Sequence, residues 1–565
     1  MNSLRHSAFT VHPGIAFSMA HTLVIGLALC TGASATDPAL QARMGDPLHG
    51  LTETQLTRFQ TGKVFFSMPI PIEDGLGPIM NKSNCGSCHS NPIGGWGAIS
   101  VTRFGMEKKG VFSLYPGETQ SLAQSLSNST FCAEVVPADA TVVRTRLTNS
   151  SMAFGLVEAI PDAQIAAHED VLDADGDGVS GRVHWVRPLE SAPTSPLRAG
   201  RFGWKAQVAT VLTFSSDASR NEMGLTNRLS PSENPPNGDF ARLTICDEVA
   251  DPEDVNDSEG FAFIDRVTHF QRYLAPPPQT PRSGMTGEAL FNQIGCAKCH
   301  SPSYTTSGDL TLEDAIRSKA IRPYSDFLLH DVGLLADGIS DGDASESEMR
   351  TPTLWGVRTR DPMLHDASAS GGTFTPRVIL AISKHGPFGE GASSAAAFAA
   401  LSPSNQAHVV KFLNSLGRAE FDFDGDGIID ILDFFALRAC IAQSTTNPDH
   451  ECAVADTNQD GLVNATDVDL FVLAFNGDIL DCNGNQVADL RDIALGTSQD
   501  ANDDGVPDEC TACPSDVNAD GTVNGADLSI VLANWGGSGA GDTDHDGAVT
   551  GADLASVLAA WGPCQ

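Results

Sequence analysis

Two pentapeptides in this chain combine cysteine and histidine at a spacing that can anchor an iron porphyrin. Cys85-Gly86-Ser87-Cys88-His89 and Cys296-Ala297-Lys298-Cys299-His300 both have the form C-x-x-C-H. This is the attachment signature of a c-type haem, in which two thiols bond to the haem vinyl groups and the next imidazole lies beneath the iron. The alternatives are a zinc site, which needs four close ligands, and a redox dithiol, which does not need the histidine. We predict two covalently bound c haems, held by Cys85, Cys88, His89, Cys296, Cys299 and His300.

The C-terminal quarter carries carboxylates at the spacing of calcium-binding loops. Residues 419–565 contain 28 of the 71 acidic residues but only Arg438 and Arg491 as basic ones, so they hold −26 of the net charge of −37. Asp and Asn recur at loop positions that surround one hard cation with oxygen. The predicted Ca²⁺ ligands are Asp422, Asp424, Asp426, Asp430 and Asp433; Asp456, Asn458, Asp460, Asn464 and Asp467; Asp516, Asn518, Asp520, Asn524 and Asp527; and Asp542, Asp544, Asp546 and Asp553.

An apolar helix is expected after each complete loop. Leu528, Val531, Leu532 and Trp535 follow the helical period, and Leu554, Val557, Leu558 and Trp561 repeat it. Such short helices cannot fold alone, so we expect their apolar faces to pack on each other and the clustered carboxylates to need calcium for folding. A solvated acidic spacer is the alternative. Two degenerate loops begin at Asp481 and Asp500, and a further acidic loop holds Asp173, Asp175 and Asp177, either as a calcium site or as a polar turn.

The first 35 residues predict an export signal. Arg5 gives a weakly positive start, Ala16–Leu29 is mostly apolar, and Ala33-Ser34-Ala35 is typical of a cleavage site. A membrane anchor and a lipoprotein site at Cys30 are the alternatives. Because haem c is attached outside the cytoplasm, export agrees with the C-x-x-C-H motifs. We predict a periplasmic, cell-surface or secreted protein with no membrane span after the signal is removed.

Eight of the 13 cysteines remain once Cys30 leaves with the signal and four bind haem. An even number in an oxidising compartment indicates disulfides, although sequence alone does not give their connectivity. The simplest pairing is Cys132–Cys246, Cys440–Cys452, Cys482–Cys510 and Cys513–Cys564.

Length and charge limit the fold and the partners. A chain of 565 residues is too long for one core, and Pro276-Pro277-Pro278 marks a natural boundary. The acidic balance excludes nucleic acid, which needs basic patches. We predict a mainly α protein with two cytochrome c-like haem domains, long loops and short calcium-loop–helix repeats. The predicted segments are a signal peptide (1–35), a first haem domain (36–275), a second haem domain (276–418) and the calcium-binding repeats (419–565).

Four motifs in the body occur in a recognisable order. They are Gly200-Arg201-Phe202-Gly203-Trp204-Lys205-Ala206, Asn221-Glu222-Met223-Gly224, Tyr324-Ser325-Asp326-Phe327-Leu328-Leu329-His330-Asp331 and Arg350-Thr351-Pro352-Thr353-Leu354-Trp355-Gly356. With them the body resembles the di-haem oxidoreductase family, relatives of the bacterial di-haem cytochrome c peroxidases. The resemblance implies a redox enzyme that acts on a small oxidant.

The resemblance also implies a sixth ligand for the second haem. Related peroxidases place a methionine shortly after their counterpart of His365, and the di-haem oxidoreductases place a His-Gly there. This chain offers His385-Gly386, so we expect His385 as the ligand, with His365 as the next candidate and His330 or Met363 as further ones.

The first haem has no obvious second ligand, which suits an open site where peroxide or O₂ can bind. Peroxide cleavage needs a base and a polar group that stabilises the departing charge. Related peroxidases use a glutamate near the position of Thr213 in this chain, so the residue differs here. Glu158 and Glu222 are the catalytic candidates, with surface charges as the alternative.

Three further side chains could serve the haems. Arg103 and Arg146 could pair with haem propionates, and Trp204 could carry electrons between the haems or be a core residue. The predicted function is an exported di-haem oxidoreductase, peroxidase-like, in which the second haem passes electrons from a periplasmic donor to a first haem that activates peroxide. The alternatives are an electron-transfer cytochrome, an enzyme that acts on O₂ as the related di-haem rubber oxygenases do, and a surface-assembly protein.

The C-terminal loops resemble dockerin type I modules, in which Asp replaces the terminal Glu of an EF-hand. The stretch Asp481–Cys510 is closer to thrombospondin type 3 calcium repeats. Dockerins bind cohesins, so the resemblance implies a cohesin-like or cell-surface partner and a role in assembly or attachment.

Overall fold

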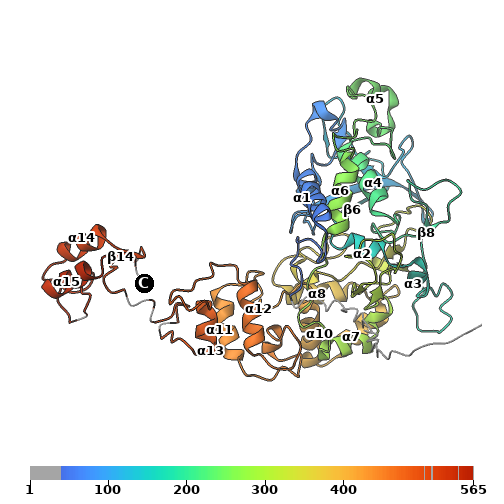
Figure 1. Ribbon diagram of the computed structural model, residues 1–565. Helices are drawn as coiled ribbons and strands as arrows, with labels where there is room; N and C mark the ends of the chain where they lie inside the picture. The colour runs from blue at the N-terminus through green and yellow to red at the C-terminus, as the bar shows by residue number, and fades with distance from the viewer. Residues whose placement is uncertain are drawn as a thin grey trace, which may run out of the picture. The chain divides into compact units, whose positions relative to one another are not determined.

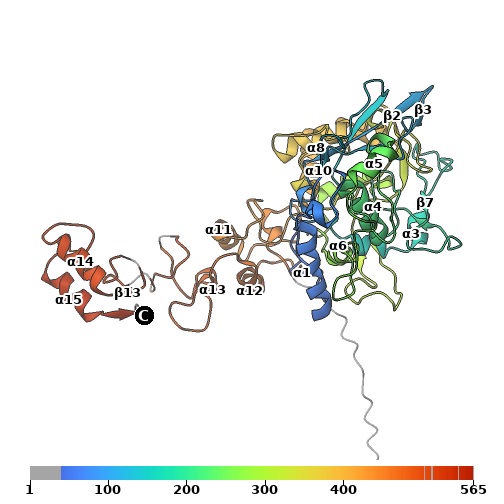
Figure 2. The ribbon, with the colours of Figure 1, turned by 90° about the horizontal axis from the view of Figure 1, so that it is seen from above.

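The structure is a computed structural model that describes residues 40–565, except residues 502, 509, 511, 512, 519, 545, 564 and 565. Within this range the regular secondary structure is mainly α-helix, with small antiparallel sheets and long loops between the helices (Figures 1 and 2). None of the described helices is long and apolar enough to cross a membrane. The predicted signal peptide and its cleavage site lie outside the described residues.

The chain before the predicted boundary at residue 276 holds six described helices and most of the strands. The helices are α1 (Glu53–Ser67), α2 (Phe154–Glu158), α3 (Asp162–Ala166), α4 (Val211–Met223), α5 (Phe240–Cys246) and α6 (Phe263–Tyr273). The strands are β1 (Ile79–Met80), β2 (Ser100–Lys108), β3 (Val111–Ser113), β4 (Leu122–Ala123), β5 (Leu126–Ser127), β6 (Val142–Leu147), β7 (Trp185–Val186) and β8 (Arg198–Ala199).

Helices α1 and α6 lie side by side in the largest hydrophobic core (Figure 1). Gly62 allows this close contact, because a Cβ at that position would lie 2.3 Å from the backbone oxygen of Arg266. The rings of Phe59 and Phe270 pack across the contact with centroids 5.2 Å apart. Burial of such aromatic rings contributes strongly to core stability. The packed pair of helices therefore fixes the position of the segment that follows α1 and leads to Cys85.

A four-stranded antiparallel arrangement around β2 was not predicted from the sequence. Strand β2 pairs with β3, β4 and β6, and in its register with β6 Val101 is opposite Arg146 and Arg103 is opposite Arg144. Because side chains alternate along a strand, Arg103 and Arg146 lie on the same face of this sheet. The sheet therefore brings together two arginines that are far apart in the sequence.

The chain from residue 276 to 418 is built around helices α7 and α10. The helices here are α7 (Thr286–Gln293), α8 (Phe374–Ser383), α9 (Ala392–Ala400) and α10 (Pro403–Ser415), and the strands are β9 (Tyr304–Thr305), β10 (Ala320–Ile321), β11 (Leu329–Asp331) and β12 (Glu348–Arg350). A Cβ on Gly287 of α7 would lie 1.9 Å from the backbone oxygen of His408 in α10, so these helices also touch at a glycine. Helix α10 is the last helix of this part of the chain.

The acidic region forms a short helix at each of the four complete loops, as predicted, and one helix more. The predicted helices are α11 (Ile431–Cys440), α12 (Ala465–Ala474), α14 (Gly525–Ala533) and α15 (Gly551–Ala559), and the additional helix is α13 (Asp489–Leu495). Four of them begin with a capping box made by loop positions 9 and 12, for example Asp430 with Asp433 and Asn464 with Asp467. The residue that closes each loop therefore also starts its helix.

The predicted apolar faces of α14 and α15 are only partly buried. Val531 and Val557 are fully buried, together with Val523 and Val549. Leu532, Trp535, Leu558 and Trp561 are instead between 51% and 55% exposed. The prediction that the whole face packs between the helices was wrong for these four residues. The spacing of apolar residues identifies one face of a helix, but it does not specify which part of the protein packs against that face.

Three of the predicted disulfides are confirmed. Cys132–Cys246, Cys440–Cys452 and Cys482–Cys510 are bonded. The predicted fourth bridge involves Cys564, which lies outside the described residues. The free cysteines among the described residues are Cys85, Cys88, Cys296 and Cys299.

Candidate functional site

The second C-x-x-C-H motif borders a cavity of about 210 Å³. Cys296 lies at the start of the short helix η4 (Cys296–Lys298), directly after α7, and the turn continues to Cys299 and His300. His300 Nδ1 lies 2.9 Å from the backbone oxygen of Tyr324, and this contact fixes the orientation of the ring. The other ring nitrogen, Nε2, is left to coordinate a metal ion. Burial lowers the pKa of His300 to about 4, so the imidazole is neutral, as a metal ligand must be.

Both histidines predicted as sixth ligands line this same cavity. His385 follows α8, and its Nδ1 lies 2.9 Å from the backbone oxygen of Ala381. His365 packs edge-on against Trp204 with ring centroids 5.9 Å apart. Burial lowers the pKa of both histidines, so each is a neutral donor. Met363 also lines the cavity.

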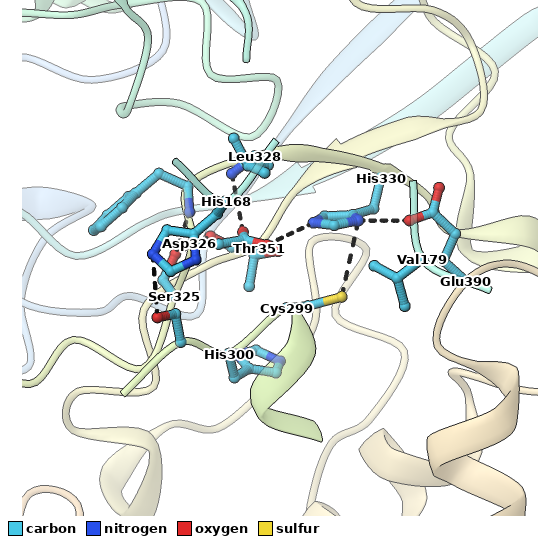
Figure 3. Close-up of polar contacts among 12 residues, drawn as sticks. His168, Val179, Cys299, His300, Ser325, Asp326, Leu328, His330, Thr351 and Glu390 are labelled. Atoms are coloured by element: carbon cyan, nitrogen blue, oxygen red, sulfur yellow. Dashed lines mark hydrogen bonds and ion pairs between the residues drawn. The ribbon is translucent and has the colours of Figure 1, made fainter. Parts of the chain in front are cut away.

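His330 lines the cavity too, but its two ring nitrogens are both engaged (Figure 3). Nε2 lies 2.8 Å from Asp326 Oδ2, and Nδ1 lies 2.6 Å from Glu390 Oε2. Burial opposes a charge on this ring, yet Asp326 and Glu390 raise its pKa well above the ordinary histidine value. His330 is therefore an imidazolium beside Cys299, whose Sγ lies 3.8 Å from Nδ1, and it does not offer a free nitrogen to a metal.

A buried guanidinium without an acceptor points into this cavity region. Arg360 is stacked over Trp96 at 4.0 Å and over Trp204 at 5.4 Å from the ring centroids. Its Nε and one terminal nitrogen are enclosed and have no hydrogen-bond partner among the described residues. Burial, with Arg350 nearby, lowers the pKa of Arg360 to about 9. Buried cations need a counter-charge, so this arrangement fits an anionic group such as a haem propionate.

The first C-x-x-C-H motif borders a second cavity, of about 170 Å³. Cys85 begins the short helix η2 (Cys85–Ser87), and the turn places Cys88 and His89 at the cavity wall. His89 Nδ1 lies 3.3 Å from the backbone oxygen of Gly95, and burial lowers the pKa of His89 to about 4. This site thus repeats the arrangement of the other one: two thiols and a neutral imidazole held by a backbone carbonyl.

The wall of the second cavity is more polar and includes Glu222. Helix α4 supplies Glu222 and Asp217, and burial raises the pKa of both carboxyl groups. Glu222 Oε2 accepts a hydrogen bond from Asn81 Nδ2 at 2.7 Å. Arg103 and Arg146 line the same cavity. Arg146 Nε lies 2.7 Å from Asp337 Oδ2, and Arg103 Nε has no acceptor among the described residues.

Glu158, the other predicted catalytic carboxylate, lies outside both cavities. Its Oε1 is 2.9 Å from Arg272 Nη1, and its Oε2 accepts a hydrogen bond from the backbone nitrogen of Val211. It is not among the residues that line either cavity. Thr213, at the position where related peroxidases have their glutamate, donates to Glu190 and also does not line the cavity.

Trp204 is shared by the two cavities. Its indole nitrogen donates to the backbone oxygen of Leu147 at 2.8 Å, so the ring is fixed in place. Four polar groups at these sites were not predicted from the sequence: Asp217, Arg360, and the two carboxylates at His330, Asp326 and Glu390. The sequence offered one sign of Asp217, because it precedes Asn221 of a quoted motif by one helical turn. In the structure Asn221 Nδ2 donates a hydrogen bond to Asp217 at 2.8 Å.

The acidic loops have the shape expected for calcium sites. In the first loop, oxygens of Asp422, Asp424 and Asp433 converge within 4.8 Å of one another. In each loop the backbone nitrogen of position 6 donates to the carboxylate of position 1; for Asp456, Asp516 and Asp542 the donors lie at 3.1, 2.7 and 2.9 Å. Calcium-binding loops of this kind are closed by the same turn.

The acidic loop in the body differs from its prediction in one residue. Asp170, rather than Asp177, converges with Asp173 and Asp175. Asp177 instead pairs with Lys298, whose Nζ lies 3.1 Å from Oδ2. Backbone nitrogens of Ala174 and Gly178 donate hydrogen bonds to Asp170 and Asp173 and close the loop.

Two family models match separate parts of the chain. The family model described as "Di-haem oxidoreductase, putative peroxidase" matches residues 107–416, and the dockerin type I domain model matches residues 420–472. The first C-x-x-C-H motif precedes the matched range. No curated protein sequence matches the chain.

Two solved structures are similar over much of the chain. A MauG-like protein associated with microbial copper homeostasis has 15% identity and a TM-score of 0.26, covering 67% of this chain and 93% of its own. Hydrazine synthase from Kuenenia stuttgartiensis has 12% identity and a TM-score of 0.28, covering 72% and 100%. The assignment rests on the family models alone. Since the first model covers more than half of the 565 residues, the chain belongs to the di-haem oxidoreductase family and carries a dockerin type I region after it.

Proposed function

We propose that this protein is an exported oxidoreductase with two covalently attached c haems, and that peroxide reacts at the site of Cys85, Cys88 and His89. The main support is the repeated arrangement of two free thiols and a neutral histidine at two cavities that share Trp204. When bound, the haems would supply the redox chemistry, with the second passing electrons toward the first.

His89 and His300 would each bind an iron through one ring nitrogen, because the other nitrogen is held by a carbonyl. At the second site, His385 or His365, which line the same cavity as His300, would supply a further ligand. Arg360 at this site and Arg103 and Arg146 at the other would neutralise propionates. Trp204, in contact with both cavities, would shorten the electron path between them.

Glu222 would accept and donate protons at the first site. The residue lines the cavity, and burial raises the pKa of its carboxyl group above the ordinary value. A carboxyl group positioned at a reacting oxygen can accept and return a proton. Asp217 on the same helix adds a second buried carboxyl group. Proton transfer between the two oxygens of a peroxide is the step for which such a pair is suited.

Spectroscopy of the purified, exported protein tests this proposal. A high-spin signal from one iron, cyanide binding and peroxide turnover with an artificial electron donor are expected. Two low-spin irons and no cyanide binding would support the alternative of an electron carrier. Oxidised organic products formed with O₂ alone would support the alternative of an oxygenase.

Replacing Glu222 by Gln should lower the rate of reaction with peroxide by about 10²- to 10⁴-fold, because the side chain can no longer accept a proton. Stopped-flow absorbance of the haem gives this rate. The matched variant is Glu158→Gln, which lies outside the cavity and should react at close to the wild-type rate. If the rate fell equally in both variants, Glu222 would have no specific role in proton transfer.

Replacing His385 by Ala should convert the second haem from a low-spin to a high-spin form, because the site loses its strong sixth ligand. Electron paramagnetic resonance and the absorbance near the Soret maximum report this change. The variant His365→Ala should keep the low-spin signal. The reverse result would assign the ligand to His365.

We also propose the domain division at residues 36–275, 276–418 and 419–565. Separate hydrophobic clusters over residues 285–416, 421–493 and 523–557 support it. The largest cluster continues across residue 276 as far as Trp355, so the two haem domains share part of their core.

The acidic region would attach the enzyme to a protein partner, in the manner of a dockerin. The exposed Leu532, Trp535, Leu558 and Trp561 favour this role, since large apolar side chains on a surface mark interaction sites. A chain that ends at Arg418 should keep peroxide turnover but lose its association with cells or with a cohesin-type partner. Loss of turnover together with attachment would contradict the division of roles.

A further inference from the structure

Three carboxylates converge in the body at a place that the proposed redox chemistry does not use. Glu233 comes from the loop after α4, and Asp251 and Glu253 come from the loop that joins α5 to α6. One oxygen of each lies within 4.8 Å of one oxygen of the other two. None of these residues lines either cavity.

Glu233 is a buried carboxyl group without a partner. Its side chain belongs to a residue only 4% exposed. Both carboxyl oxygens are enclosed, and no hydrogen-bond donor among the described residues reaches them. Enclosing an unpaired carboxylate is costly, so the arrangement calls for a compensating cation or a retained proton.

The other two carboxylates are held in place by one residue. Thr226 Oγ1 donates to Asp251 Oδ1 at 2.7 Å, and the Thr226 backbone nitrogen donates to Glu253 Oε2 at 2.8 Å. Asp251 is exposed and Glu253 is half-buried, so the cluster opens to solvent on the side of Asp251. An ion could therefore enter from that side and keep water ligands there, while Glu233 closes the inner side.

The spacing and the donor set fit calcium. Two oxygens that each lie about 2.4 Å from one ion can be at most about 4.8 Å apart, and all three oxygens meet that limit. Carboxylates without nitrogen or sulfur favour a hard cation. Ca²⁺ accepts irregular shells completed by water, whereas Mg²⁺ requires a nearly ideal octahedron. We propose that Glu233, Asp251 and Glu253 bind one Ca²⁺ ion, in addition to the ions of the acidic C-terminal region.

Binding there would connect two loops of the first haem domain. The loop that carries Glu253 also packs tightly against Gly75, where a Cβ would lie only 2.4 Å from the Glu253 Cβ, and Gly75 lies on the segment that leads to Cys85. The ion would thus fasten the loop after α4 to a segment near the first C-x-x-C-H motif.

Equilibrium dialysis of the full-length, haem-loaded protein against saturating radioactive Ca²⁺ tests the proposal. Glu233→Gln should bind one ion fewer per chain than wild type. The control is Glu248→Gln, an exposed residue in the same joining loop, which should bind the wild-type number. An unchanged number in Glu233→Gln would overturn the proposal and indicate that Glu233 holds a proton.

Asp251→Asn keeps the test decisive if the buried variant does not fold. Asp251 lies at the exposed side of the cluster, so its replacement should be tolerated while the ion is lost. Loss of one bound ion supports the site, and the wild-type number overturns it. Because the measurement counts ions and not turnover, it is independent of whether peroxide is the oxidant.

Discussion

The double variant Cys296→Ala with Cys299→Ala is expected to leave the exported protein with one haem in place of two. Both thiols border the cavity, and the other cysteines bonded in the described structure are not available to replace them. Without thioether bonds the porphyrin is held only by His300 and surrounding contacts and is lost on denaturation. The mass of the denatured chain should fall by one haem, and the Soret absorbance per polypeptide should fall to about half.

A matched control comes from the disulfide of the acidic region. Cys440→Ser with Cys452→Ser also removes two cysteines, but it should retain both haems because neither residue borders a cavity. The counterpart Cys85→Ala with Cys88→Ala should lose the other haem and with it the reaction with peroxide. If the Cys296/Cys299 variant had the same haem content as the control, covalent attachment at that motif would be refuted.

Removal of calcium should unfold the acidic region while the haem-binding body stays folded. The aspartates at loop position 12, Asp433, Asp467, Asp527 and Asp553, are at most 1% exposed, so each loop brings buried carboxylates together. The core of the second pair of helices is small and has four fully buried valines, whereas the core around α11 to α13 has twelve buried residues. Without cations the repulsion exceeds what such cores can offset, and helices α11 to α15 should melt.

Far-ultraviolet circular dichroism before and after chelation measures this loss, and the Soret band reports the body in the same sample. Readdition of Ca²⁺ should restore the helical signal, and Mg²⁺ at the same concentration should restore it less. Double replacement of Asp433 and Asp467 by Asn should abolish the response of the first pair of helices alone. A chelated chain with an unchanged helical signal and unchanged resistance of its tail to protease would contradict the calcium requirement.

Local spacing made much of this molecule predictable. The C-x-x-C-H motifs and the acidic loops lie within five and twelve neighbouring residues, so their geometry follows from short stretches of backbone. The helix starts were also predictable, since Asp433 and Asp467 cap the helices that follow their loops. Three disulfides agreed with the simplest pairing.

Features made by distant segments were not predictable from one sequence. His330 meets Glu390 across 60 residues, and Arg146 meets Asp337 across 191. The sheet around β2 depends on pairing between strands, which the alternation of a single strand does not specify. Glu158 and Glu222 were equivalent in the sequence, and only the tertiary structure separates a carboxylate paired with Arg272 from one in a cavity wall.

The contrast between bonded and free cysteines has a consequence for biosynthesis. Each free pair, Cys85 with Cys88 and Cys296 with Cys299, is a vicinal dithiol in a chain whose other described cysteines are oxidised. Oxidants that close the structural bridges would also close these dithiols, and an oxidised pair cannot form thioethers. Maturation therefore requires an order: a reductant has to keep both dithiols open until porphyrin arrives, and a cell that lacks such a reductant should accumulate a colourless chain with internal bonds at both motifs.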